Sequence, residues 1–139
     1  MPKKYEFIEH TADLGFKAYG ATLFELFVHA AQALFETLVI PESVEDRLER
    51  SIDVEAEALD DLMVSWLSEL LYLYDTEKLL FRDFQIQKIQ DHRLRAKARG
   101  EVFDPARHEI KTGVKAVTYH QLYVKEKAGG WETQVILDI

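Results

Sequence analysis

The chain has 139 residues, 47% of them hydrophobic, which is enough to fill one core, so we expect a single domain over residues 1–139. Its 17 Lys and Arg residues against 25 Asp and Glu residues give a formal net charge of −8, which argues against general coating of a nucleic-acid backbone. Cysteine is absent, which excludes disulfides, thiolate metal sites and a thiol nucleophile.

The N-terminal segment does not resemble a secretory leader. Residues 1–6 lack the apolar core of a signal peptide, and the sequence contains no run of about 18 apolar residues that would span a bilayer. We therefore expect a soluble, cytoplasmic protein without membrane contact.

The first forty residues predict two strands and a helix. Aromatic and β-branched residues alternate with polar ones at 5–8 and 16–19, which predicts two short strands with Asp13 in the loop between them. Thr22 followed by Glu25 matches a capping box, and apolar residues then recur at the spacing of one helical face. The predicted helix ends before Pro41.

A strand and a second helix follow. Apolar and acidic residues alternate over 52–57, which predicts a strand. Asp60 and Asp61 then place negative charge where a helix N-terminus is positive, and an apolar stripe runs from Leu59 to Tyr74. This segment is predicted to be an amphipathic helix.

The remainder of the chain changes to a periodicity of two, which predicts antiparallel strands at 84–86, 94–98, 114–118 and 135–137. Lys127 to Gly130 predicts a tight hairpin, whose register places Asp138 opposite Tyr119, His120 or Gln121. The predicted fold class is α+β and two-layer, with two helices packed on one face of a mostly antiparallel sheet in the order β-β-α-β-α-β-β-β-β.

Acidic residues near both ends of the chain are candidate metal ligands. Asp138 and Ile139 finish an apolar strand, and Asp13 lies in the first predicted loop. If the fold joins them, their oxygen-only donors suit a divalent ion such as Ca²⁺ or Mg²⁺, with Mn²⁺ as an alternative, better than zinc or copper. Other interpretations stay open: Asp13 as part of an Asx turn, and Asp138 as a charge that ends a strand.

Lys115 and the histidines carry weaker signals. Lys115 lies on a predicted strand, either as a solvated lysine or as a functional one, and the hairpin register puts it on the order of 10 Å or more from Asp138. His10, His108 and His120 lack the spacing of a zinc motif, so we predict no zinc site.

Four basic residues alternate along one predicted strand and should project from one face: Arg93, Arg95, Lys97 and Arg99. Such a stripe suits RNA phosphates or an acidic partner, but it is more typical of the wet face of a sheet that neutralises nearby carboxylates, an interpretation that the overall acidity favours. The sequence contains no Gly-rich phosphate loop, serine-nucleophile elbow or aromatic RNA-binding strand, so it predicts no catalytic site.

Several short segments together resemble the archease family over almost the whole chain. They are Glu9 to Gly15, Gly100-Glu101, Phe103-Asp104, Arg107-His108, Lys115 to His120 and Val135 to Ile139. Archeases assist the RtcB-type ligase that joins RNA exons in tRNA splicing.

The resemblance implies a non-catalytic cofactor protein. It implies that Asp13, Asp138 and Ile139 bind the metal, and that ligase activation depends on Lys115 and Asp13. It further implies that the chain promotes guanylylation of the ligase, sustains multiple turnover and broadens the use of nucleoside triphosphates. The alternatives are a stand-alone metal-dependent phosphoester hydrolase and an RNA-binding or chaperone-like module.

Overall fold

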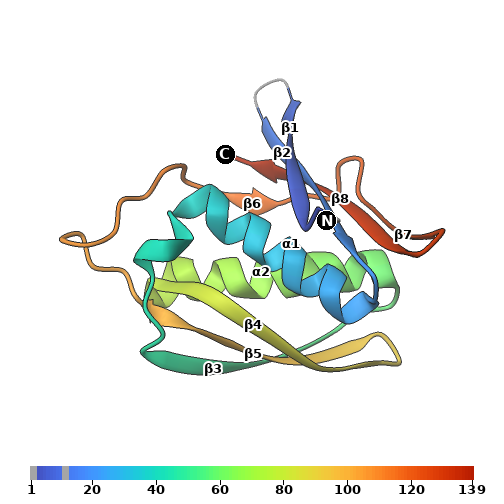
Figure 1. Cartoon of the computed structure of the whole chain (residues 1–139), viewed down its shortest axis with the longest axis horizontal. Coiled ribbons are helices and arrows are strands. Elements are labelled where there is room, and N and C mark those ends of the chain that lie inside the picture. The colour runs from blue at the N-terminus through green and yellow to red at the C-terminus, as the bar shows by residue number, and fades with distance from the viewer. Residues whose placement is uncertain (1–2, 11–12) are drawn as a thin grey trace.

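The computed structural model describes residues 3–10 and 13–139, apart from the side chain of His10. Thr11 and Ala12, which belong to one of the archease-like segments, lie outside these ranges. The elements in chain order are β1 (Tyr5–His10), β2 (Asp13–Gly20), α1 (Leu23–Leu38), a 3₁₀ turn (Pro41–Ser43), β3 (Leu48–Glu55), α2 (Leu59–Glu77), β4 (Leu79–Gln90), β5 (Arg93–Val102), β6 (Ala116–Val117), β7 (Tyr123–Lys127) and β8 (Gly130–Asp138) (Figure 1).

The strands form two antiparallel sheets. The first has the order β1-β2-β8-β6, with β7 also paired to β8, and the second has the order β3-β5-β4. Figure 1 shows both helices between the two sheets. The predicted α+β class is confirmed, whereas the expectation of a single sheet covered on one face is wrong.

The second sheet is needed because α1 is apolar around much of its circumference. Ala30, Ala31, Ala33, Leu34 and Phe35 are all buried, although they point in different directions around the helix. A helix of this kind must be covered on more than one side, since one sheet would leave part of it in water.

Both predicted helices are confirmed, and local chemistry explains their ends. The Glu25 N–H donates to the Thr22 hydroxyl at 3.2 Å, which caps the start of α1. The Val39 N–H donates to the Phe35 carbonyl at 2.9 Å where α1 ends. Lys78 ends α2 in the left-handed conformation, with φ of 60°. Within the described ranges, no helix has the length and apolarity needed to cross a membrane.

The pairing of β8 is interrupted, and this changes the predicted register. The hairpin turn expected at Lys127 to Gly130 is present, but it joins β8 to β7, a strand that was not predicted, with Tyr123 opposite Gln134. Continuing that register would place Tyr119 opposite Asp138, but Ala116 lies there instead. The last strand is therefore paired with β7 along its first part and with β6 at its end.

The interruption comes from a turn between β6 and β7. The Leu122 N–H donates to the Tyr119 carbonyl at 3.2 Å, and Gln121 adopts a positive φ of 51°. The turn takes up chain that an uninterrupted hairpin would have placed in the ladder. The predicted pairing of Asp138 with Tyr119, His120 or Gln121 is therefore wrong.

Candidate functional site

Asp13 and Asp138 lie at the same end of neighbouring strands. β2 and β8 are antiparallel, and Leu14 pairs with Leu137. Asp13 precedes this pair on β2 and Asp138 follows it on β8. Because strand residues alternate between faces, both aspartates belong to the face opposite that of the leucine pair. The fold thus joins the two acidic segments that are far apart in sequence.

Lys115 reaches the same end of the sheet through β6. Its N–H donates to the Asp138 carbonyl at 2.7 Å. The estimate of about 10 Å or more was based on an uninterrupted hairpin, so it is wrong for the placement of these two residues. Lys115, Asp138 and Ile139 are exposed, and Asp13 is partly exposed. We call Asp13, Asp138 and Ile139, with Lys115 beside them, the acidic end.

The donor chemistry of the acidic end fits a hard cation. Asp13, Asp138 and Ile139 offer oxygen donors, the type that Ca²⁺ and Mg²⁺ prefer. The Asp138 carbonyl already accepts the Lys115 N–H, but its carboxylate is a separate donor. In the part of the chain that the structure describes, no three His, Cys, Asp or Glu side chains gather into a metal-binding group. An ion here would be held by two side chains, a backbone oxygen of Ile139 and water, and Mg²⁺ commonly retains several waters.

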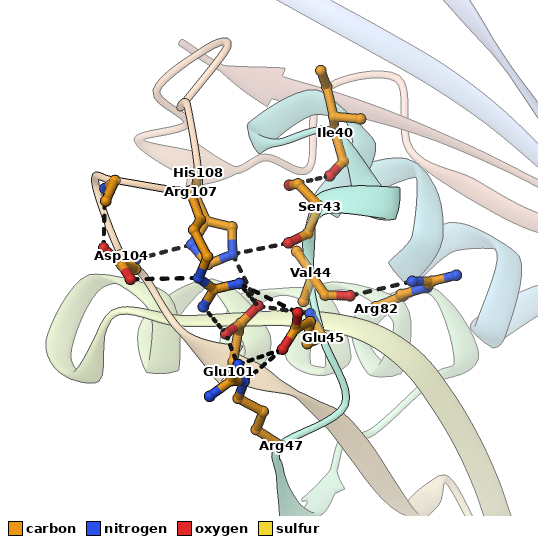
Figure 2. Close-up of polar contacts among 11 residues, drawn as sticks. Ile40, Ser43, Val44, Glu45, Arg47, Arg82, Glu101, Asp104, Arg107 and His108 are labelled. Carbon is orange, nitrogen blue, oxygen red and sulfur yellow. Dashed lines mark hydrogen bonds and ion pairs between the residues drawn. The ribbon is translucent and has the colours of Figure 1, made fainter.

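A second polar centre lies between β5, the segment before β3 and the loop after β5 (Figure 2). Glu101 on β5 is only 2% exposed and accepts hydrogen bonds from the Arg107 guanidinium on both carboxylate oxygens. It also accepts the Glu45 N–H at 2.7 Å, and its Oε2 lies 3.0 Å from His108 Nε2. We call Glu45, Glu101, Arg107 and His108 the Glu101 cluster.

The hydrogen bonds of His108 define its tautomer. Its Nδ1 accepts the Asp104 N–H at 2.9 Å, so the proton of the neutral ring is on Nε2. Nε2 faces both Glu101 and the Ser43 carbonyl, the latter at 3.1 Å. His108 is therefore a buried, fully bonded residue of the Glu101 cluster.

The Glu101 cluster gives a structural role to the three archease-like segments in the middle of the chain. It joins the loop after β5, which leads to Lys115, to the segment before β3. Sequence reasoning recorded these residues as motif positions but missed their contact with one another. The available signal was Glu101 within seven positions of Arg107 and His108, which is too common a pattern to identify a buried ion pair.

We expect the Glu101 cluster to make stability depend on pH in acid. Hydrogen bonding by Arg107, opposed by burial and assisted by the Glu45 N–H and His108, lowers the pKa of Glu101 from 4.5 to about 2. Its contribution to stability is thus complete above about pH 4.5 and is lost as the pH falls towards 2. Denaturant titrations from about pH 6 to about 2.5 should show a steeper loss of unfolding free energy for wild type than for Glu101→Gln. Parallel curves for the two proteins would contradict this prediction.

The basic stripe is paired within the chain. Arg93, Arg95, Lys97 and Arg99 alternate along β5, as predicted. Asp53 on β3 binds Arg93 through two hydrogen bonds of 2.9 Å, and Glu49 accepts from Arg99 at 3.0 Å. Arg95 and Lys97 lie 3.9 and 3.7 Å from the same two carboxylates. This pairing favours the wet face of a sheet over an RNA-binding stripe.

Comparisons with known proteins give one family over nearly the whole chain. The Archease protein family (MTH1598/TM1083) matches residues 5–139. Protein archease of Methanosarcina mazei is 43% identical over 99% of this chain and 97% of its own length. Protein archease of Pyrococcus furiosus is 45% identical over 99% of both chains.

Two solved structures have the same fold as this chain. The solution structure of Methanobacterium thermoautotrophicum protein 1598 matches with a TM-score of 0.86 and 38% identity, over 98% of this chain and 99% of that one. A crystal structure from Thermotoga maritima, described as an archease and possible chaperone, matches with a TM-score of 0.66. It is 22% identical over 100% of this chain and 98% of that one, and at this identity the match shows a common fold only.

Proposed function

Because this chain belongs to the archease family, we propose that it is an accessory protein that activates an RtcB-type RNA ligase in tRNA splicing. In this role it promotes guanylylation of the ligase, sustains its multiple turnover and broadens its use of nucleoside triphosphates. The observation that carries the proposal is the acidic end, where Asp13 on β2 and Asp138 on β8 meet Lys115.

The acidic end has the groups that nucleotidyl transfer requires near a phosphate. Guanylylation releases pyrophosphate, so negative charge must be neutralised where the bond breaks. A divalent ion bound there would supply that neutralisation. Asp13, Asp138 and a backbone oxygen of Ile139 would hold it, and the exposed Lys115 would attract the phosphate.

The location of the acidic end supports insertion into a partner. Asp138 ends β8 at the margin of the five-stranded sheet, Ile139 follows it, and both are exposed. Asp13 is held beside them by β2–β8 pairing, so the fold positions these donors before any partner arrives. The side chains can thus approach a cleft in the ligase without rearrangement of the core.

Substitution of the aspartates should abolish stimulation. The chain would be mixed in substoichiometric amounts with an RtcB-type ligase from the same organism, GTP, Mn²⁺ and broken RNA, and ligations per ligase would be counted. We expect many turnovers with wild type and at least about a tenfold loss of stimulation with Asp13→Asn or Asp138→Asn, because each removes one anionic oxygen ligand.

The matched control is Asp91→Asn, the same change in the β4–β5 turn of the other sheet. It should stimulate as wild type does. An active ligase that wild type does not stimulate would refute the accessory role. Full stimulation by both Asp13→Asn and Asp138→Asn would show that stimulation does not require the acidic end.

A further inference from the structure

A pocket of about 440 Å³ lies at the opposite end of the five-stranded sheet from the acidic end. It is formed by Lys3 and Lys4, the end of β2, the start of α1 and the β7–β8 turn. Figure 1 shows the end of β2, the start of α1 and the β7–β8 turn on one side of the molecule. Gly20 in its wall is seven residues beyond Asp13 on β2, or roughly 23 Å along a strand. The pocket is therefore a separate site.

Three lysines line this pocket, which we call the lysine pocket. Lys3 is paired with Glu6 at 2.7 Å and Lys127 with the buried Glu132 at 2.6 Å. Lys4 has no ion-pair partner among residues 3–10 and 13–139. Its backbone is held in place, because the Lys4 carbonyl accepts the Tyr19 N–H at 2.9 Å. Glu25 and Glu132 also line the pocket, so the two paired lysines are balanced by carboxylates, and Lys4 is the cation left available to an anion.

Trp131 supplies an aromatic surface to the lysine pocket. It is partly buried against the core, and its indole N–H has no acceptor in the described part of the chain. It is paired with Gly20 across β2 and β8. Next to it the backbone is closely packed, since a Cβ on Gly130 would lie 2.4 Å from the Gly20 carbonyl oxygen. The pocket thus has Trp131 beside a closely packed backbone wall.

His29 on α1 adds a hydrogen-bond acceptor. Its Nδ1 lies 2.5 Å from the Tyr19 carbonyl oxygen. A carbonyl can only accept, so Nδ1 carries the proton and Nε2 of the neutral ring has a lone pair. Nε2 has no partner among the described residues. A hydroxyl or amino group of a ligand can donate to it.

We propose that the lysine pocket binds a nucleoside phosphate. The base would lie against Trp131, the phosphate would contact Lys4, and His29 would accept from a ribose hydroxyl. A volume of about 440 Å³ is in the range of small-molecule sites. Aromatic stacking combined with lysine contacts is how proteins hold nucleotides without reading sequence. The ligand is either a free mononucleotide or the terminal nucleotide of an RNA strand, which present the same chemistry.

Tryptophan fluorescence provides a direct test. The only other tryptophan, Trp66, is fully buried and donates to the Phe27 carbonyl at 2.9 Å, so added ligand reaches only Trp131. GMP, AMP, inorganic phosphate and a short single-stranded RNA with a 5′-phosphate would each be titrated into wild type. We expect saturable quenching by the nucleotides or the RNA, with affinity weakened at least about tenfold in Lys4→Glu.

The matched control is Lys88→Glu, the same charge reversal on β4 in the other sheet. It should bind as wild type does. Equal affinity for GMP and RNA would identify a free nucleotide as the ligand, and RNA at least about tenfold tighter would identify a strand end. Absence of saturable quenching, inorganic phosphate binding as tightly as GMP, or equal weakening by Lys88→Glu would overturn the proposal. None of these results depends on the ligase assay.

Discussion

Glu101→Ala should lower the free energy of unfolding by about 2–3 kcal/mol, because it removes a buried carboxylate that accepts several hydrogen bonds, one of them from the buried His108. Arg107 loses its two hydrogen bonds to Glu101 but keeps Asp104 at 3.5 Å, and the Glu45 N–H loses its 2.7 Å hydrogen bond. His108 Nε2 keeps the Ser43 carbonyl but loses Glu101. Denaturant unfolding followed by circular dichroism at pH 7 measures the change.

A surface carboxylate gives the matched control for this change. Glu49→Ala removes ion pairs to Arg99 and Lys97, but these lie on the exposed face of the β3-β5-β4 sheet. Exposed pairs contribute about 0–1 kcal/mol, so this variant should remain close to wild type. If Glu101→Ala costs no more than Glu49→Ala, the Glu101 cluster does not stabilise the fold as described.

Gly100→Ala should destabilise the protein by more than about 3 kcal/mol, although it adds a single methyl group. A Cβ at this position would lie 1.8 Å from the Leu80 carbonyl oxygen and 2.8 Å from Phe81 Cα. Both atoms are backbone, so no side-chain rotation relieves the overlap. The β4–β5 pairing must open, and thermal unfolding should show a large drop in Tm.

Gly113→Ala is the same chemical change without the overlap. No atom lies within 4 Å of a Cβ built on Gly113, so this variant should unfold within about 0.5 kcal/mol of wild type. A Gly100→Ala protein as stable as Gly113→Ala would show that the β4 and β5 backbones are farther apart than the structure places them.

The two helices could be predicted from the sequence because their signals are local. The Thr22 side chain accepts the N–H of Glu25, only three residues away, at the start of α1. Apolar residues in the helix recur every three or four positions, so the signal is contained in a short stretch of sequence. The division of the strands into two sheets could not be predicted, since it depends on which segments pair across the chain. Leu14 and Leu137 pair across 123 positions, and nothing in either segment specifies the other.

For the candidate site, too, the residues could be predicted from the sequence but their contacts could not. The resemblance indicated Asp13, Asp138 and Lys115, but the contact between Lys115 and Asp138 depends on the turn before β7. Gln121 takes a positive φ there with no Gly, Asn or Asp to mark the turn. The lysine pocket was missed entirely, because Lys4 and Trp131 come from opposite ends of the chain and form no motif.

The central position of β8 has a consequence for biosynthesis. β8 is the last strand to be made, yet it pairs with β2 on one side and with β6 and β7 on the other. The β1–β2 hairpin is synthesised first, but β8, which pairs with β2, leaves the ribosome only after the two helices and the other sheet have been made. A nascent chain stopped before β8 therefore has an open sheet that quality-control proteases can recognise. Because Asp138 belongs to that strand, a product truncated before it also lacks the acidic end.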